Sequence, residues 1–401
     1  MRICKIWDSE YPWDVRAEKV SRALTEAGHE VHLLARNRTR LPRVEVRPEA
    51  KVHRLPAFPL GSIGRGLQFP AFFNPVWLHQ IWNVARRERA DLLLVRDLPL
   101  APAVIVIGRM LGIPVVMDMA ENYPAMMASI FDTGVSKPMD RVIRHPSVVG
   151  LVERWVIARV DRILVVVDES AERLGKLGVP SERITLVSNT PPLSRLAERR
   201  PATRESIPLK LVYLGLLEEP RGLSVLLRAV SLCQHAGVRV QVTIIGDGRE
   251  RLKLERQARE LQLDTAVVEF TGYLPNREAL QLVEEADVGL VPHLATDSWN
   301  STIPNKLFDY MAAGLPILTS DARPAARVVR ETRTGIVYAH DDPAALAQAI
   351  MEITPYAVRN ALSENGPTAV MEQYNWGNDA GRLVAAVEAV GNRPKAASSV
   401  D

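Results

Sequence analysis

A polar cluster at the start of one short helix is the part of the sequence best suited to chemistry. Residues 301–316 read S-T-I-P-N-K-L-F-D-Y-M-A-A-G-L-P and lie between two apolar runs that predict buried strands. Pro304 fits the first turn of a helix, and Gly314 followed by Pro316 predicts its end. The first turn leaves backbone N–H groups unpaired, and Lys306 lies within that turn. The sequence therefore predicts an anion site at the helix start.

A carboxylate one turn further along extends this interpretation to a nucleotide. Asp309 follows Lys306 by three residues and lies on a neighbouring helix face. We expect the backbone amides and Lys306 to bind phosphates and Asp309 to bind ribose hydroxyls. Ser301 and Thr302 are candidate helix caps. The alternative is an ordinary amphipathic helix in which Lys306 and Asp309 form a solvated pair, and their spacing alone leaves both interpretations open.

Length and composition predict a globular protein of two domains. The chain has 401 residues, of which 47% are hydrophobic and 24% are charged. Cys4 and Cys233 are too far apart in sequence to indicate a disulfide framework or a metal-binding motif, which fits a reducing compartment. Residues 1–7 read as a first strand rather than a secretory signal. We therefore expect a cytoplasmic protein.

Charge is distributed unevenly along the chain. Residues 1–200 carry 30 Lys and Arg against 22 Asp and Glu, whereas the remainder carries 20 against 25. A basic first half indicates an anionic partner, such as a phospholipid surface, a lipid diphosphate or an acidic glycan. Nucleic acid is not expected, because aromatic residues are few and no recognised binding motif is present. The basic run 36–54, followed by the aromatic segment 56–82, predicts peripheral contact with an anionic membrane; alternatively, the aromatic residues pack inward.

The alternation of apolar strands and amphipathic helices predicts an α/β protein built of two doubly wound parallel sheets. The predicted division is residues 1–190 for an N-terminal domain, 191–208 for a Pro- and Arg-rich linker, 209–366 for a C-terminal domain, 367–390 for a C-terminal helix and 391–401 for a disordered tail. Residues 126–146 give few clear signals and are interpreted as an irregular insertion.

The string within residues 301–316 resembles the nucleotide-sugar segment of family 4 (group 1) retaining glycosyltransferases, in the subset that reads P-N-K-L-F-D/E-Y-M-A-A-G-x-P. The resemblance extends over nearly the whole chain. It implies a GT-B fold, in which two Rossmann-like domains face a central cleft, the second domain binds the donor and the C-terminal helix crosses back to the first. It also implies sugar transfer with retention of configuration, with neither a metal nor another cofactor.

The same resemblance assigns donor-binding roles to single residues. In the family, the turn that begins at the position of Gly215 carries an Arg directly after the Gly and a Lys before the next Gly, and both bind the donor diphosphate. This sequence has Leu216 and Arg221 at those positions, so one charge is absent. The segment around Leu274 resembles the turn whose backbone contacts the base.

The family signature has two glutamates, eight positions apart. Asp309 matches the second and is shorter by one methylene, whereas Ser301 stands at the first and is not an acid. We therefore expect Ser301, Thr302 or a nearby backbone amide to substitute for the first acid. Asn305 and Lys306 match the P-N-K string and complete the expected donor site.

Two segments of the first half resemble the family's acceptor side. Residues 118–124, D-M-A-E-N-Y-P, are similar to the motif D-x-H-E-x-x-P, with Ala in place of His, which makes Glu121 and Asp118 the candidate catalytic acids. Arg16 and Glu18 fall in a helix start that reads D-x-R-x-E-K, and the resemblance directs Arg16 toward an acceptor phosphate. The alternative for residues 118–124 is a structural role, such as a cap for the following turn. The alternative for Arg16 and Glu18 is an ordinary surface turn.

We therefore expect a transferase that moves a sugar from a UDP- or GDP-sugar to a glycan or lipid-diphosphate acceptor, in bacterial surface-polysaccharide assembly at the inner face of the membrane. Two alternatives remain open. One is a sugar-nucleotide epimerase of the same architecture. The other is a non-catalytic partner subunit of a transferase, an interpretation motivated by Leu216, Ala120 and Ser301 at positions where the family has polar residues.

Overall fold

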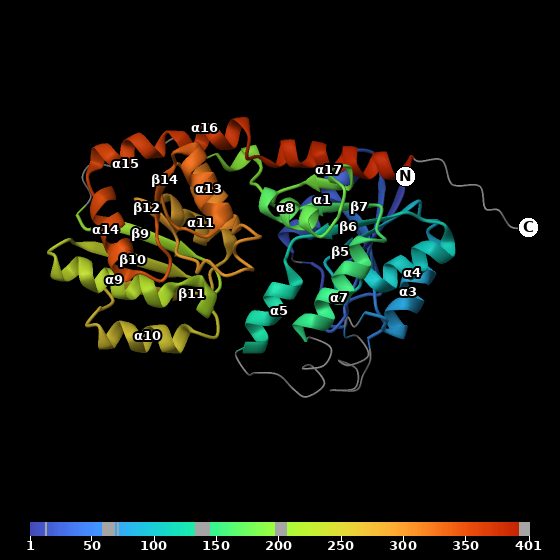
Figure 1. Cartoon of the computed structure of the whole chain (residues 1–401), viewed down its shortest axis with the longest axis horizontal. Coiled ribbons are helices and arrows are strands. Elements are labelled where there is room, and N and C mark those ends of the chain that lie inside the picture. Colours follow the sequence, from blue (N-terminus) through green and yellow to red (C-terminus); the bar gives the residue numbers. More distant parts are fainter. Residues whose placement is uncertain (13, 58–68, 70–71, 133–144, 197–206, 393–401) are drawn as a thin grey trace, which may run out of the picture. The chain divides into compact units, whose positions relative to one another are not determined.

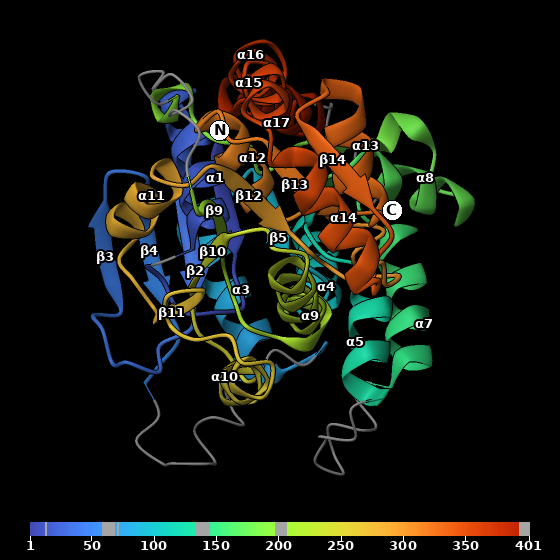
Figure 2. The same ribbon diagram turned by 90° about the vertical axis from the view of Figure 1, so that its left-hand side faces the viewer.

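The chain divides into two compact units, and each is described by itself. The computed structural model describes residues 1–12, 14–57, 69, 72–132, 145–196 and 207–392. Unit 1 consists of Met1–Ser188 together with Asp379–Asp401, and unit 2 consists of Asn189–Asn378. Each unit is a largely parallel β-sheet with helices on both faces (Figures 1 and 2). These sheets confirm the expected fold class.

Unit 1 contains an eight-stranded sheet with the order β3-β4-β2-β1-β5-β6-β7-β8. Its strands are β1 (Arg2–Ile6), β2 (Glu30–Ala35), β3 (Val44–Arg47), β4 (Ala50–Arg54), β5 (Leu92–Arg96), β6 (Val115–Met119), β7 (Arg162–Val165) and β8 (Ile184–Leu186). Only the edge pair β3–β4 is antiparallel. The central strands read as continuous apolar runs because helices cover them on both faces.

The helices of unit 1 begin where side chains or prolines favour a start. They are α1 (Val15–Glu26), α3 (Pro75–Arg87), α4 (Ala101–Leu111), α5 (Tyr123–Asp132), α7 (Pro146–Ile157), α8 (Asp168–Lys176) and most of α17 (Trp376–Gly391). The Asp14 carboxylate caps α1 by accepting from the Ala17 amide at 2.7 Å, and Asn74 caps α3 ahead of Pro75. Helices α3, α4 and α7 bury their apolar sides in one core with β1, β5 and β6.

Unit 2 contains a six-stranded, wholly parallel sheet with the order β11-β10-β9-β12-β13-β14. Its strands are β9 (Leu209–Leu214), β10 (Val240–Ile245), β11 (Val268–Gly272), β12 (Val288–Val291), β13 (Ile317–Ser320) and β14 (Gly335–Tyr338). Its helices are α9 (Leu223–His235), α10 (Arg251–Glu260), α11 (Asn276–Glu284), α12 (Asn305–Ala312), α13 (Arg323–Thr332), α14 (Pro343–Ile353), α15 (Tyr356–Ser363) and α16 (Asn365–Glu372).

The order of the strands in unit 2 reverses direction between β9 and β12. The chain moves outward through β10 and β11, returns through α11 to β12, and then moves the other way to β14. Helices α9 and α10 therefore lie on one face of the sheet and α11, α12 and α13 on the other, while α14 packs beside α9 (Figure 2). In open α/β sheets ligands bind outside the carboxyl ends of the strands at such a reversal.

Several predicted elements differ from the structure. The basic run 36–54 contains the edge strand β3 and its neighbour β4, and part of the segment 126–146 belongs to helix α5. The single predicted C-terminal helix is two helices, α16 and α17. Parts of the predicted insertion, linker, tail and aromatic segment lie outside the described residues, namely 133–144, 197–206, 393–401, 58–68 and 70–71.

The aromatic segment packs largely inward where it is described. Trp77 and Ile81 are fully buried on the core side of α3, and Phe72 and Trp82 are partly buried against the same core. Only Phe73 is strongly exposed. The prediction of an aromatic surface patch is therefore wrong for Trp77 and Ile81, because their spacing of four residues places both on the apolar face of one helix. Within the described residues, no helix is both long and apolar enough to span a bilayer.

Candidate functional site

Helix α12 positions the polar cluster that the sequence predicts. Pro304 precedes its first turn in an extended conformation, and the chain leaves it through Gly314 in the left-handed region, with φ of 70°. Its apolar side is held by Phe308, which packs on the ring of Tyr374 at 5.4 Å between ring centres. The Tyr310 hydroxyl accepts from the amide of Leu214 at 2.9 Å, which ties the helix to the end of β9.

The ammonium group of Lys306 is buried, and it has no hydrogen-bond partner among the described residues. The side chain is 7% exposed, and Nζ lies 3.6 Å from the centre of the Tyr213 ring. A Cβ added at Gly215 would lie only 3.0 Å from this Nζ. Burial, and then the nearby Arg221, lower the pKa of Lys306 well below its usual value. An anion placed here would supply the missing partner.

Arg221 reaches the same place from the turn that follows β9. Its Nη1 donates to Nε2 of His293 at 3.0 Å, and its guanidinium group stacks over the ring of Trp299 at 4.4 Å. Burial, followed by the charges of Lys306 and Arg221, lowers the pKa of His293 well below its usual value, so the imidazole is neutral and accepts this bond. Its Nδ1 then carries the proton and is a second buried donor without a partner among the described residues.

Close contacts between loop backbones hold these groups in place. Gly222 has φ of 69°, and a Cβ there would lie 1.7 Å from the carbonyl oxygen of Pro292. A Cβ on Gly246 would lie 2.0 Å from the carbonyl oxygen of Gly215. The amide of Gly215 donates to the carbonyl of Ile245 at 2.9 Å. Larger residues at these two glycines would push the loops apart. The loops after β9, β10 and β12 therefore form one packed unit.

Asp309 lies one turn after Lys306 in α12 and already has a partner. Its Oδ1 accepts from Nη1 of Arg195 at 3.1 Å, and the two side chains are 20% and 31% exposed. Arg195 comes from a single 3₁₀ turn, η2 (Leu193–Arg195), early in unit 2. A partly exposed pair of this kind contributes on the order of 1 kcal/mol or less, so another ligand can replace it.

The other predicted donor residues occupy varied positions around this cluster. Ser301 is buried, and its hydroxyl closes the turn before α12 by donating to the carbonyls of Asp297 and Ser298, at 2.8 and 3.1 Å. Thr302 is also buried. Further predicted residues are Asn305, exposed as the first residue of α12, and Leu274, half-buried before the start of α11. The structure thus brings Gly215, Arg221 and Lys306 together, whereas the roles of these other residues stay predictions.

In unit 1, Arg16 and Asp118 form a buried ion pair. Nη2 of Arg16 lies 2.5 Å from the Asp118 carboxylate and 3.0 Å from the carbonyl oxygen of Val187, and both side chains are nearly inaccessible. Burial raises the pKa of Asp118, but Arg16 outweighs it and the net pKa is lowered. Nη1 of Arg16 lacks a partner among the described residues. Glu18 is instead on the surface, in an exposed pair with Arg22.

Asp97 is an acidic residue near the candidate catalytic acids that the sequence analysis missed. It follows β5 directly, is 4% exposed, and accepts from the amide of Ala120 at 3.0 Å. Burial, with further contributions from Glu121 and Asp118, raises the pKa of Asp97 to about 7. Glu121 is half-buried, two residues after the end of β6. A carboxyl group with a pKa near 7 suits proton transfer, and its place at the carboxyl end of a strand is the signal that could have found it.

Family comparisons match both halves of the chain. Residues 14–190 match the family described as glycosyl transferase 4-like domain, and residues 208–354 match the family described as glycosyl transferases group 1. Together the two matches span most of the chain. Both halves of the chain therefore match glycosyltransferase families.

Relatives and solved structures agree with this assignment. The glycosyltransferase WcaL of Escherichia coli (strain K12), named for colanic acid biosynthesis, is 30% identical over 193 residues, which cover 48% of this chain and 47% of WcaL. The match thus spans about half the length of this relative. Sucrose-phosphate synthase from Thermosynechococcus elongatus superposes with a TM-score of 0.76 at 20% identity, covering 97% of this chain and 99% of the synthase.

A second solved structure contains a nucleotide. Anabaena Alr3699/HepE in complex with UDP and glucose superposes with a TM-score of 0.70 at 15% identity, covering 97% of this chain and 100% of HepE. At these identities the likeness establishes the GT-B fold alone.

Lys306, whose amine has no hydrogen-bond partner among the described residues, predicts an unusual effect on stability. Lys306→Met keeps most of the side-chain volume and removes a buried group that lacks a partner, so we expect the ligand-free protein to gain about 1–2 kcal/mol in free energy of unfolding. Urea unfolding of both proteins measures the difference. Lys253→Met, at an exposed pair with Glu250, is the matched control and should change stability little. A destabilised Lys306→Met protein would contradict the assignment.

The raised pKa of Asp97 predicts a second effect. Between its ordinary pKa of 3.8 and the folded-state value of about 7, the folded protein binds more protons than the unfolded chain, so this residue makes stability fall as pH rises. The melting temperature of Asp97→Asn should therefore fall less than that of the parent between pH 5 and pH 8. The difference between the two falls should be about a few degrees. Thermal melts across this range test it, with the exposed Asp91→Asn as control. Parallel curves for parent and Asp97→Asn would refute it.

Proposed function

We propose that this chain is a retaining glycosyltransferase that moves a sugar from a UDP- or GDP-sugar to a glycan or lipid-linked acceptor. The observation that carries this proposal is the buried ammonium of Lys306, which has no partner among the described residues and lies beside Arg221 and Gly215. Two cations around a turn that only glycine can form suit a diphosphate, which is compact and carries more than one negative charge.

The remaining donor groups follow from the same geometry. The first-turn amides of α12 and Lys306 bind the diphosphate from one side, and Arg221 binds it from the turn after β9. Asp309, one turn further along α12, accepts the ribose hydroxyls in exchange for Arg195. The backbone near Leu274 contacts the base. The complex of HepE with UDP and glucose supports a uridine nucleotide as the first candidate to test.

The chemistry proposed for this site is charge stabilisation. As the bond between the anomeric carbon and the diphosphate breaks, negative charge grows on the leaving nucleotide, and Lys306 and Arg221 are already placed to stabilise it. A divalent ion is not needed for this task. The acceptor hydroxyl must lose a proton as the new glycosidic bond forms, and Glu121 and Asp97 offer carboxyl groups in unit 1. The pairing of Asp118 with Arg16 favours a positioning role for Asp118.

Loss of the Lys306 charge should abolish transfer. We expect Lys306→Ala to lower the rate of UDP release from UDP-glucose, or of GDP release from GDP-mannose, by at least about 100-fold. UDP or GDP should raise the melting temperature of the parent but not of this variant. Lys253→Ala provides the matched control in the same unit and should behave like the parent. Unchanged turnover and an unchanged nucleotide shift in Lys306→Ala would disprove the donor site.

The acceptor is proposed from composition and from one relative. The excess of Lys and Arg in residues 1–200 suits an anionic lipid-linked acceptor, and WcaL is named for the biosynthesis of a polysaccharide. We expect the protein to sediment with vesicles that contain anionic phospholipid, and to be released as salt is raised from about 0.05 to 0.5 M because the attraction is screened. Neutral phosphatidylcholine vesicles are the control. Equal sedimentation with both vesicle types would count against an electrostatic membrane contact.

A further inference from the structure

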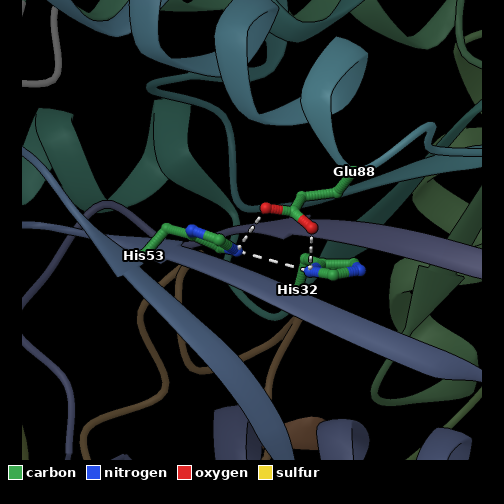
Figure 3. A group of neighbouring side chains, drawn as sticks. All are labelled: His32, His53 and Glu88. Carbon is green, nitrogen blue, oxygen red and sulfur yellow. Dashed lines mark hydrogen bonds and ion pairs between the residues drawn. The ribbon is translucent and has the colours of Figure 1, made fainter. Parts of the chain in front are cut away.

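Three side chains that the proposed transfer reaction does not use converge in unit 1. His32 lies on β2, His53 on β4, and Glu88 directly follows helix α3 (Figure 3). Nδ1 of His32 is 3.3 Å from Nε2 of His53, and the two carboxylate oxygens of Glu88 are 3.8 Å from the former nitrogen and 3.9 Å from the latter. Each residue turns one ligand atom toward the same point.

The strand pairing creates this convergence. In the parallel pair β2–β4, His53 lies opposite Leu34, which is two residues from His32. Side chains alternate across a strand, so both imidazoles project from the same face of the sheet. Helix α3 covers that face, and its end brings Glu88 to them. Residues far apart in the sequence therefore meet at a position that the fold itself determines.

The ionisation states suit metal binding. Both histidines are almost fully buried, and burial lowers the pKa of His53 to about 4 and also lowers that of His32. Both imidazoles are therefore neutral at pH 7, which is the form that binds a metal. Burial raises the pKa of Glu88, but Lys51 and Arg87 outweigh it and the net pKa is lowered, so Glu88 is a carboxylate.

Geometry and surroundings agree with a metal of the zinc class. For bonds of about 2.0–2.1 Å in a tetrahedron, ligand atoms lie about 3.3 Å apart, which is the separation of the two imidazole nitrogens. The other nitrogen of His32, Nε2, is 3.1 Å from the carboxylate of Glu30 without a hydrogen bond, and a small rotation of this exposed side chain would give the bond that orients metal-binding histidines. A cavity of about 950 Å³ lined by His53 and Arg87 provides a path for an ion.

We propose that His32, His53 and Glu88 bind one divalent transition-metal ion of the zinc class, with water at the remaining position. In the metal-free protein Lys51 is 3.0 Å from Glu88, and Arg87 donates to Nδ1 of His53 at 3.0 Å. Both cations are exposed, 36% and 60%, so they can turn into solvent as the ion enters. His53 then carries its proton on Nδ1 and binds the metal through Nε2. The ion ties β2, β4 and α3 together.

Titration of the full-length protein with Zn²⁺ and Co²⁺, after treatment with chelator and desalting, tests this site. We expect one ion per chain by calorimetry, the visible absorption of four-coordinate Co²⁺, and a melting temperature that rises with Zn²⁺. His53→Asn and Glu88→Gln should each weaken binding at least about 100-fold. Glu30→Gln should weaken it about 10- to 100-fold, because Glu30 only orients His32.

His79→Asn is the matched control, since His79 lines the same cavity but is exposed and lies outside the cluster. It should bind Zn²⁺ like the parent. Circular dichroism verifies that each variant is folded. If His53→Asn does not fold, Glu88→Gln provides the test. Absence of saturable binding to the parent would overturn the proposal, as would equal binding by parent, Glu88→Gln and His53→Asn.

Discussion

A buried lysine amine that has no hydrogen-bond partner among the described residues is the constraint on which unit 2 depends. Removing an ammonium group from water is unfavourable, and the face of the Tyr213 ring compensates only in part. The protein nevertheless keeps Lys306 buried, with Arg221 close enough to lower its pKa further. Such an arrangement stores unfavourable free energy that an incoming anion releases. In the proposed reaction, diphosphate binding and leaving-group stabilisation would have one physical origin, since the same side chains would contact the diphosphate before and after the bond breaks.

The parallel sheets were predictable because their strands appear in the sequence as short apolar runs. The predicted alternation of strands and helices is present in both units, and it forms one largely parallel sheet in each. The edge strand β3 and its neighbour β4 were missed because both contain charged residues and resemble a basic loop. Helix α13 was missed for a similar reason, since its arginines face solvent and its apolar residues form one narrow stripe.

The candidate site was predictable only where its residues lie within one continuous segment. Lys306 and Asp309 share a helix, so their spacing made them candidates, whereas Arg221 was found through the resemblance of its turn to the family. His293, Arg195 and Asp97 gain their importance from contacts with residues far away in the chain, and no local pattern reveals those contacts. Local pattern also could not show that Arg16 would be buried against Asp118, because the two are separated by 102 positions.

The contact between Arg195 and Asp309 has a consequence beyond the donor site itself. Arg195 lies seven residues after Ser188, the last residue of unit 1 before the chain enters unit 2. A sugar nucleotide whose hydroxyls bind Asp309 would displace Arg195. The segment after Ser188, which joins the two units, would then lose this contact. Donor binding would then alter the connecting segment, because Arg195 and the ribose hydroxyls compete for the same Asp309 carboxylate.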